Sequence, residues 1–132
     1  MIRTSLVIAL GLTATAAMAQ MSPVGLWRQV DDKTGQAKSE IRIAETGGAL
    51  AGRIEKTLGK DSKPDSTCDA CTDDRKGKPI AGLEIIRDGK ILDPENGKEY
   101  RASFTPVDGG QKLEMRGSIA FFGRTQTWTR IQ

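Results

Sequence analysis

The sequence contains no histidine, and this absence removes the usual base of many hydrolytic enzymes. Ser-His-Asp triads and Cys-His pairs both depend on a histidine, so this chain can form neither arrangement. The Gly-Gly pairs at 47–48 and 109–110 lie in predicted hairpin turns, whereas a phosphate-binding loop would place them before a helix. We therefore predict no catalytic residue and no cofactor, which favours a binding function over an enzymatic one.

Apolar runs long enough to span a bilayer are also missing. The short apolar run at 6–12 follows Arg3 and precedes Ala17-Met18-Ala19, which supplies small residues where a signal peptidase cleaves. This order is typical of a secretory signal cleaved between Ala19 and Gln20, although an uncleaved amphipathic anchor is the alternative. It predicts a signal peptide at 1–19, one domain at 20–132, and a periplasmic or secreted protein with no transmembrane segment after cleavage.

A strong surplus of one charge is absent as well. Without residues 1–19, the chain keeps 19 basic and 17 acidic residues, a net charge of +2. The basic residues are scattered, and no basic stripe is interleaved with aromatic side chains. The sequence therefore predicts no nucleic-acid partner.

Helical periodicity is missing from residues 20–132, and alternation takes its place. Segments such as YRASF (100–104) and LEMRGSI (113–119) place every second residue on one face, which indicates half-buried β-strands. Turn motifs rich in glycine, asparagine and aspartate separate these segments. We predict eight strands at 24–30, 38–46, 49–57, 80–87, 89–93, 98–106, 111–119 and 124–131. They favour an all-β, antiparallel eight-stranded barrel with one long polar loop at about 59–79.

The long loop contains the two cysteines of the chain, Cys68 and Cys71, in a C-x-x-C motif. Two thiols cannot complete a four-ligand zinc site without help from aspartates or a second chain, so we predict no metal site. A thioredoxin-type motif begins a helix after a strand, whereas the aspartates around this motif disfavour a reactive thiolate. We predict a structural disulfide, with zinc binding and thiol-redox chemistry as the alternatives.

The segment Gly25-Leu26-Trp27 matches the G-x-W that opens the first strand of lipocalin-like barrels. In those barrels the tryptophan plugs one end, and an arginine of the last strand packs across its ring. The resemblance implies that Gly25 and Trp27 close the barrel together with Arg124 or Arg130. An ordinary core tryptophan is the plainer interpretation.

The likeness extends along the chain from 24 to 130. The blocks VGLWRQVD, GGALAGRI, DDRKGKPIAGLEII, GKILDPENGKEY, MRGSI and GRTQTWTR occur in that order. Together they resemble the bacterial family called domain of unknown function 2147. The resemblance implies a small, exported, lipocalin-like β-barrel and assigns no activity to it.

Three functions compete on these observations. The first is a binding protein that holds a small apolar or lipid-like ligand inside the barrel. The second is a cell-envelope module that binds a partner protein through its surface and has a filled barrel, and the third is a thiol-redox protein. The candidate ligand-lining residues for the first are Trp27, Ile43, Ile54, Ile85, Tyr100, Phe104 and Met115.

The burial of Trp128 and of the pair Phe121-Phe122, near the last predicted strand, can also be predicted. Trp128 shares its strand face with Arg124, Gln126 and Arg130, so we expect it to be only partly buried. Phe121-Phe122 precedes the last strand. Because most apolar residues are buried, a plug at the barrel end is favoured over an exposed hydrophobic lip.

Overall fold

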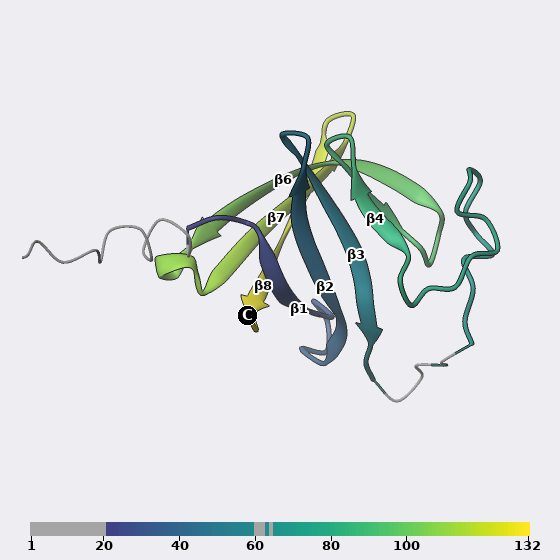
Figure 1. The fold of residues 1–132 in the computed structure, drawn as a ribbon, viewed down its shortest axis with the longest axis horizontal. Helices are drawn as coiled ribbons and strands as arrows, with labels where there is room; N and C mark the ends of the chain where they lie inside the picture. The colour runs from purple at the N-terminus through teal and green to yellow at the C-terminus, as the bar shows by residue number, and fades with distance from the viewer. Residues whose placement is uncertain (1–20, 60–62, 64) are drawn as a thin grey trace, which may run out of the picture.

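A computed structural model describes residues 21–59, 63 and 65–132, and these residues form a closed antiparallel barrel (Figure 1). The predicted signal peptide at 1–19, its cleavage point at Gln20, and residues 60–62 and 64 of the long loop lie outside the described residues. The strands are β1 (Gly25–Val30), β2 (Ala37–Thr46), β3 (Ala49–Thr57), β4 (Glu84–Arg87), β5 (Lys90–Asp93), β6 (Lys98–Val107), β7 (Lys112–Ile119) and β8 (Phe122–Arg130). The predicted eight-stranded, all-β barrel is confirmed.

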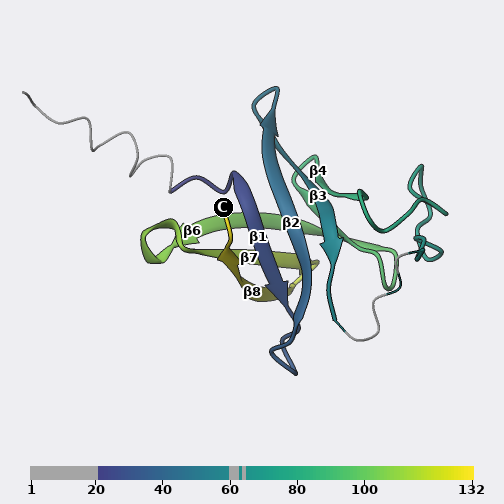
Figure 2. The same ribbon diagram turned by 60° about the horizontal axis from the view of Figure 1, so that its bottom comes forward.

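Each strand pairs with its neighbour in sequence, and β8 returns to β1 to close the barrel. The closing contact is short, with Trp27 opposite Arg130 and Arg28 opposite Thr129. In Figure 2, β1 and β2 run across the direction of β6 and β7, so the barrel resembles two crossed sheets. A short 3-10 helix (Asp108–Gly110) connects β6 to β7. In the described part of the chain, no helix is long and apolar enough to cross a membrane.

The alternating apolar residues of the strands form the interior of the barrel. Cross-strand partners point to the same face, and the register aligns Trp27 with Ile41 and Ile41 with Ile54. On the other side of the barrel, Phe104 lies opposite Met115. These apolar rows meet inside the barrel and form its core.

One predicted strand, 80–87, is too long. The structure begins β4 at Glu84, and residues 80–83 form bends and turns. Gly82 has a φ of 86°, which a strand residue does not adopt, and its N–H donates to the Ile54 carbonyl of β3. The continuous apolar pattern resembled a strand because Leu83 is buried like a strand residue.

Candidate functional site

Most of the predicted lining residues pack against one another inside the barrel. All seven belong to or pack against the core cluster, and six of them lie on the inner side of the strands: Trp27, Ile43, Ile54, Tyr100, Phe104 and Met115. Two hollows, of about 450 and 220 Å³, stand out in the described part of the chain, and none of these six residues lines either one. The packing therefore favours a filled interior, with open space on the outside of the barrel.

Ile85 does not join this interior group. A Cβ added to Gly52, which lies opposite Ile43, would collide with the side chain of Ile86. Ile86 therefore faces inward, and Ile85 beside it faces outward. The structure therefore places Ile85 on the outer side of β4, apart from the other six predicted lining residues. Ile85 is nevertheless buried and belongs to the same core cluster, which also includes Cys68 and Cys71 of the long loop.

One end of the barrel is closed by Trp27 and Arg130. The Arg130 guanidinium carbon lies 4.2 Å from the centre of the Trp27 ring, and Trp27 is fully buried. Gly25 lies beside this contact, and a Cβ there would approach the Gln132 carbonyl oxygen to 2.6 Å. Arg124 takes no part and forms an ion pair with Asp32 in the β1–β2 connection.

A layer of polar side chains crosses the interior above this closed end. Ser39 Oγ donates to Gln29 Oε1 at 2.8 Å, and Gln29 Nε2 donates to Gln126 Oε1 at 3.2 Å. The Trp128 indole N–H also donates to Gln126 Oε1, at 3.1 Å. The inward-facing Gln29 therefore has the partners that burial of an amide requires.

Beyond the polar layer, the tip of the β7–β8 hairpin forms an exposed apolar lip. We define this hairpin lip as Ile119, Phe121 and Phe122. Ile119 and Phe122 are cross-strand partners with exposed fractions of 43% and 83%, and Phe121 is fully exposed. The expected plug at the barrel end is therefore wrong, because neither phenylalanine reaches the interior.

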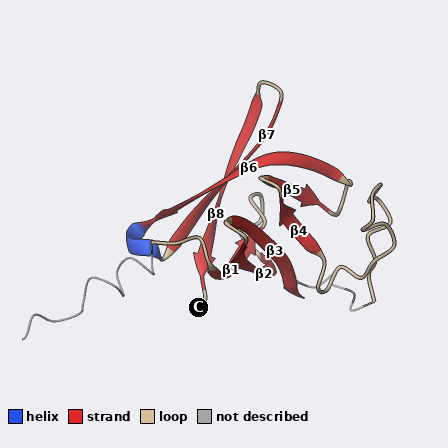
Figure 3. Ribbon diagram, turned by 45° about the horizontal axis from the view of Figure 1, so that its top comes forward, coloured by secondary structure: helices blue, strands red, loops and turns tan. Residues whose placement is uncertain are grey.

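A hollow of about 450 Å³ lies beside this lip, where the hairpin separates from β6. The pairing of β6 with β7 ends at Arg101 and Ser118, so Ile119 and Ala120 project past the ladder. Figure 3 shows the β7 hairpin diverging from the end of β6. We define this basic hollow by its lining residues: Lys90, Glu99, Arg101, Ser118, Ile119 and Ala120.

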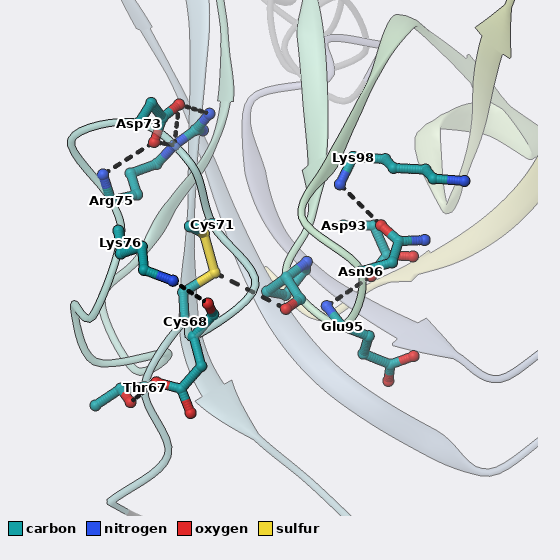
Figure 4. The surroundings of a disulfide bond; sticks show 12 residues. Thr67, Cys68, Cys71, Asp73, Arg75, Lys76, Asp93, Glu95, Asn96 and Lys98 are labelled. Atoms are coloured by element: carbon teal, nitrogen blue, oxygen red, sulfur yellow. Dashed lines mark hydrogen bonds and ion pairs between the residues drawn. A yellow bond between two sulfur atoms is a disulfide. The ribbon is translucent and has the colours of Figure 1, made fainter.

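The C-x-x-C motif forms the predicted disulfide on the outside of the barrel, which confirms that prediction. Cys68 and Cys71 are bonded to each other and fully buried. Figure 4 shows the disulfide facing the β5–β6 turn, where Cys68 Sγ lies 3.8 Å from the Pro94 carbonyl oxygen. The described residues contain no group of three or more histidine, cysteine, aspartate or glutamate side chains arranged to hold a metal ion.

A buried arginine holds the disulfide loop against the barrel. Arg75 is only 2% exposed, and its Nη1 donates to the Glu84 carbonyl oxygen at 3.0 Å. Its Nη2 lies 2.6 Å from Asp73 Oδ2 and 3.3 Å from Glu99 Oε1. Arg87 adds a second ion pair to Asp73, at 3.1 Å. Sequence patterns did not identify this clamp, because a polar loop gives no sign of which arginine it buries.

The clamp predicts an acid-dependent loss of stability. Side-chain and backbone hydrogen bonds from Arg75 hold the pKa of Asp73 well below its usual range. A depressed pKa in the folded state stabilises the protein above the unfolded value of about 4, and this contribution disappears as pH falls towards the folded value. Urea unfolding from about pH 7 to about pH 3 should therefore show a smaller acid-induced loss in Asp73→Asn than in the wild type.

The matched control for this measurement is Asp108→Asn, since Asp108 is exposed and forms no ion pair among the described residues. It should keep the wild-type acid dependence. An unchanged acid dependence in Asp73→Asn would show that the clamp does not contribute to stability.

Comparison with known proteins places the chain in a family and a fold. The family model described as "Uncharacterized protein conserved in bacteria (DUF2147)" matches residues 25–130. A solved structure titled "Protein HP1028 from the human pathogen Helicobacter pylori belongs to the lipocalin family" superposes with a TM-score of 0.69 at 16% sequence identity. The match covers 85% of this chain and 84% of that chain, so the two share a fold. A search of curated proteins found no match.

Proposed function

This chain belongs to the DUF2147 family, and from that premise we propose that it is an exported, non-enzymatic binding protein for a small apolar or lipid-like ligand. The lipocalin-like barrel supports a binding function, since such barrels commonly present a ligand site within or at the mouth of the sheet. We place the ligand at the hairpin lip, on the outside of a filled barrel.

The exposed lip is the observation that carries this proposal. Burying a phenylalanine side chain contributes about 1.5–3 kcal/mol, yet two adjacent phenylalanines project into water here. Gly117 pairs with Arg124 across β7 and β8, and Ile119 pairs with Phe122. Ile119 is two positions after Gly117 and Phe122 two positions before Arg124, so the lip lies on the same, inward-facing side of the hairpin. Contiguous exposed apolar side chains are typical of binding sites, whereas isolated ones are common on any surface.

Export rests on separate observations. The order of residues in 1–19 matches a signal peptide cleaved before Gln20. The disulfide between Cys68 and Cys71 suits an oxidising compartment such as the periplasm or the extracellular space. Both features agree with a binding protein that works outside the cytoplasm.

The test is native mass spectrometry of protein expressed from the full sequence and purified from the periplasm or medium. We expect a chain that starts at Gln20 and carries a small molecule. Phe121→Ser/Phe122→Ser should weaken binding about tenfold or more and lower the occupancy accordingly, because the two lost ring contacts together are worth roughly 1.4 kcal/mol or more.

The matched control is Met21→Ser/Val24→Ser, which removes two other exposed apolar side chains and should leave occupancy unchanged. A retained Met1 would contradict export. A bound small molecule whose occupancy is equal in the lip variant and the control would contradict the site. A co-purifying protein without a small molecule would favour the envelope-module interpretation.

A further inference from the structure

The charges in the basic hollow add information about the ligand that the apolar lip alone does not give. Lys90, Arg101 and Ser118 form one cross-strand row on the outer faces of β5, β6 and β7. Lys90 and Arg101 are directly opposite each other, a placement in which two like charges repel. The row therefore concentrates positive charge next to a hydroxyl group in the lining of the hollow.

The positive charge of this row is not neutralised within the described part of the chain. Every other described arginine forms an ion pair or a side-chain hydrogen bond, but Arg101 forms neither, and Lys90 also has none. Glu99 lines the same hollow, but its carboxylate is paired with the buried Arg75 at 3.3 Å. The guanidinium and ammonium groups are thus available to an anion from outside.

The hollow and the lip are continuous through Ile119. This residue lines the hollow and is also the cross-strand partner of Phe122. Ser118 faces the outer side of the sheet and Ile119 the inner side, and both border the hollow because the hairpin extends past the end of the β6–β7 ladder. A ligand anchored at the basic row can therefore reach the apolar side chain of Ile119 around this free edge. The volume of about 450 Å³ lies in the range of sites for a single small molecule.

We infer that the ligand is a single-chain anionic amphiphile, with its carboxylate or phosphate head on the row Lys90–Arg101–Ser118 and its apolar chain on the hairpin lip. This inference rests on the proposed function and specifies the chemistry of its ligand. The planar guanidinium of Arg101 can donate two parallel hydrogen bonds to either head group. Lys90 adds a second charge, and the Ser118 hydroxyl adds a donor.

Isothermal titration of the delipidated mature protein with three probes of equal chain length tests the inference. The probes are dodecanoate, dodecyl phosphate and dodecanol, each below its aggregation concentration. We expect the neutral alcohol to bind at least about tenfold more weakly than the better of the two anions, because it lacks the charge-assisted hydrogen bonds. The ranking of the two anions then identifies the head group.

Arg101→Gln should weaken the binding of both anions about tenfold and leave dodecanol binding unchanged. Lys56→Gln is the matched control, since it removes one exposed positive charge from β3 and should change none of the three affinities. Rising salt should weaken anion binding in the wild type more than in Arg101→Gln.

Different results would overturn the inference and the proposed function separately. If dodecanol binds as tightly as the anions, and Phe121→Ser/Phe122→Ser weakens all three, the lip site stands and the anionic head is refuted. If the anions bind but Arg101→Gln has no effect, the basic row is refuted. If none of the probes binds, or if the lip variant changes no affinity, both the site and the inference fail.

Discussion

Trp128→Ala is expected to lower the free energy of unfolding by about 3–5 kcal/mol, the usual range for deletion of a buried aromatic side chain. Trp128 is fully buried, and its ring centroid lies 6.0 Å from that of Phe104 in a tilted arrangement. It lies opposite Leu113, which is also fully buried. A loss of this size is a large share of the stability of a small domain.

Urea unfolding followed by far-ultraviolet circular dichroism measures this loss without relying on tryptophan fluorescence. Trp128→Phe is the conservative control, because it keeps an aromatic ring against Phe104 and removes the indole N–H that donates to Gln126. It should cost less than the alanine variant. A loss below about 1 kcal/mol for Trp128→Ala would contradict the filled interior.

The expectation of a half-buried Trp128 failed for a definite physical reason. Its strand neighbours Arg124 and Gln126 suggested a water-exposed face, but Gln126 has partners that allow an inward position and Arg124 lies at the exposed end of the strand. Gln126 bonds to Gln29, and Arg124 pairs with Asp32. The alternation of residues along a strand identifies which side chains share a face. It does not show whether the polar side chains on that face form hydrogen bonds or ion pairs.

The positions of the strands could be predicted from the sequence, because both the alternation of apolar residues and the turn-forming residues are local features of a few consecutive positions. The strand β3 was predicted with its observed bounds, 49–57, and β2 differs from the prediction by one residue. The error at 80–83 arose where apolar residues are buried without strand pairing. An apolar segment buried under a loop and an apolar strand buried in the sheet have the same residue composition, so the sequence alone does not distinguish them.

The basic hollow was missed, although part of its signal was present. The turn at 94–97 sets Asp93 opposite Lys98, and counting back along both strands places Lys90 opposite Arg101. The separation of the hairpin from β6 was not predictable, since it depends on where the β6–β7 ladder ends in three dimensions. The exposed phenylalanines depend on the same geometry, so the expected plug could not be distinguished from a lip.

The final prediction concerns the closed end of the barrel, where Trp27 and Arg130 act together. Trp27→Ala is expected to cost about 3–5 kcal/mol, because the ring is fully buried and its indole N–H donates to the Pro23 carbonyl at 2.7 Å. Arg130 covers the ring and donates to the carbonyl oxygens of Ser22, Val24 and Gly110, which joins β8 and the segment before β1 to the β6–β7 connection.

A double-mutant cycle with Trp27→Ala and Arg130→Met separates the stacking contact from the carbonyl bonds. Arg130→Met alone should cost about 1–3 kcal/mol, since it removes the hydrogen bonds and the charge but keeps much of the aliphatic stem. The coupling energy should be about 1–2 kcal/mol, the range for a desolvated cation on an aromatic face. A coupling energy near zero would mean that Arg130 binds the carbonyl groups independently of Trp27, and that the tryptophan alone closes this end of the barrel.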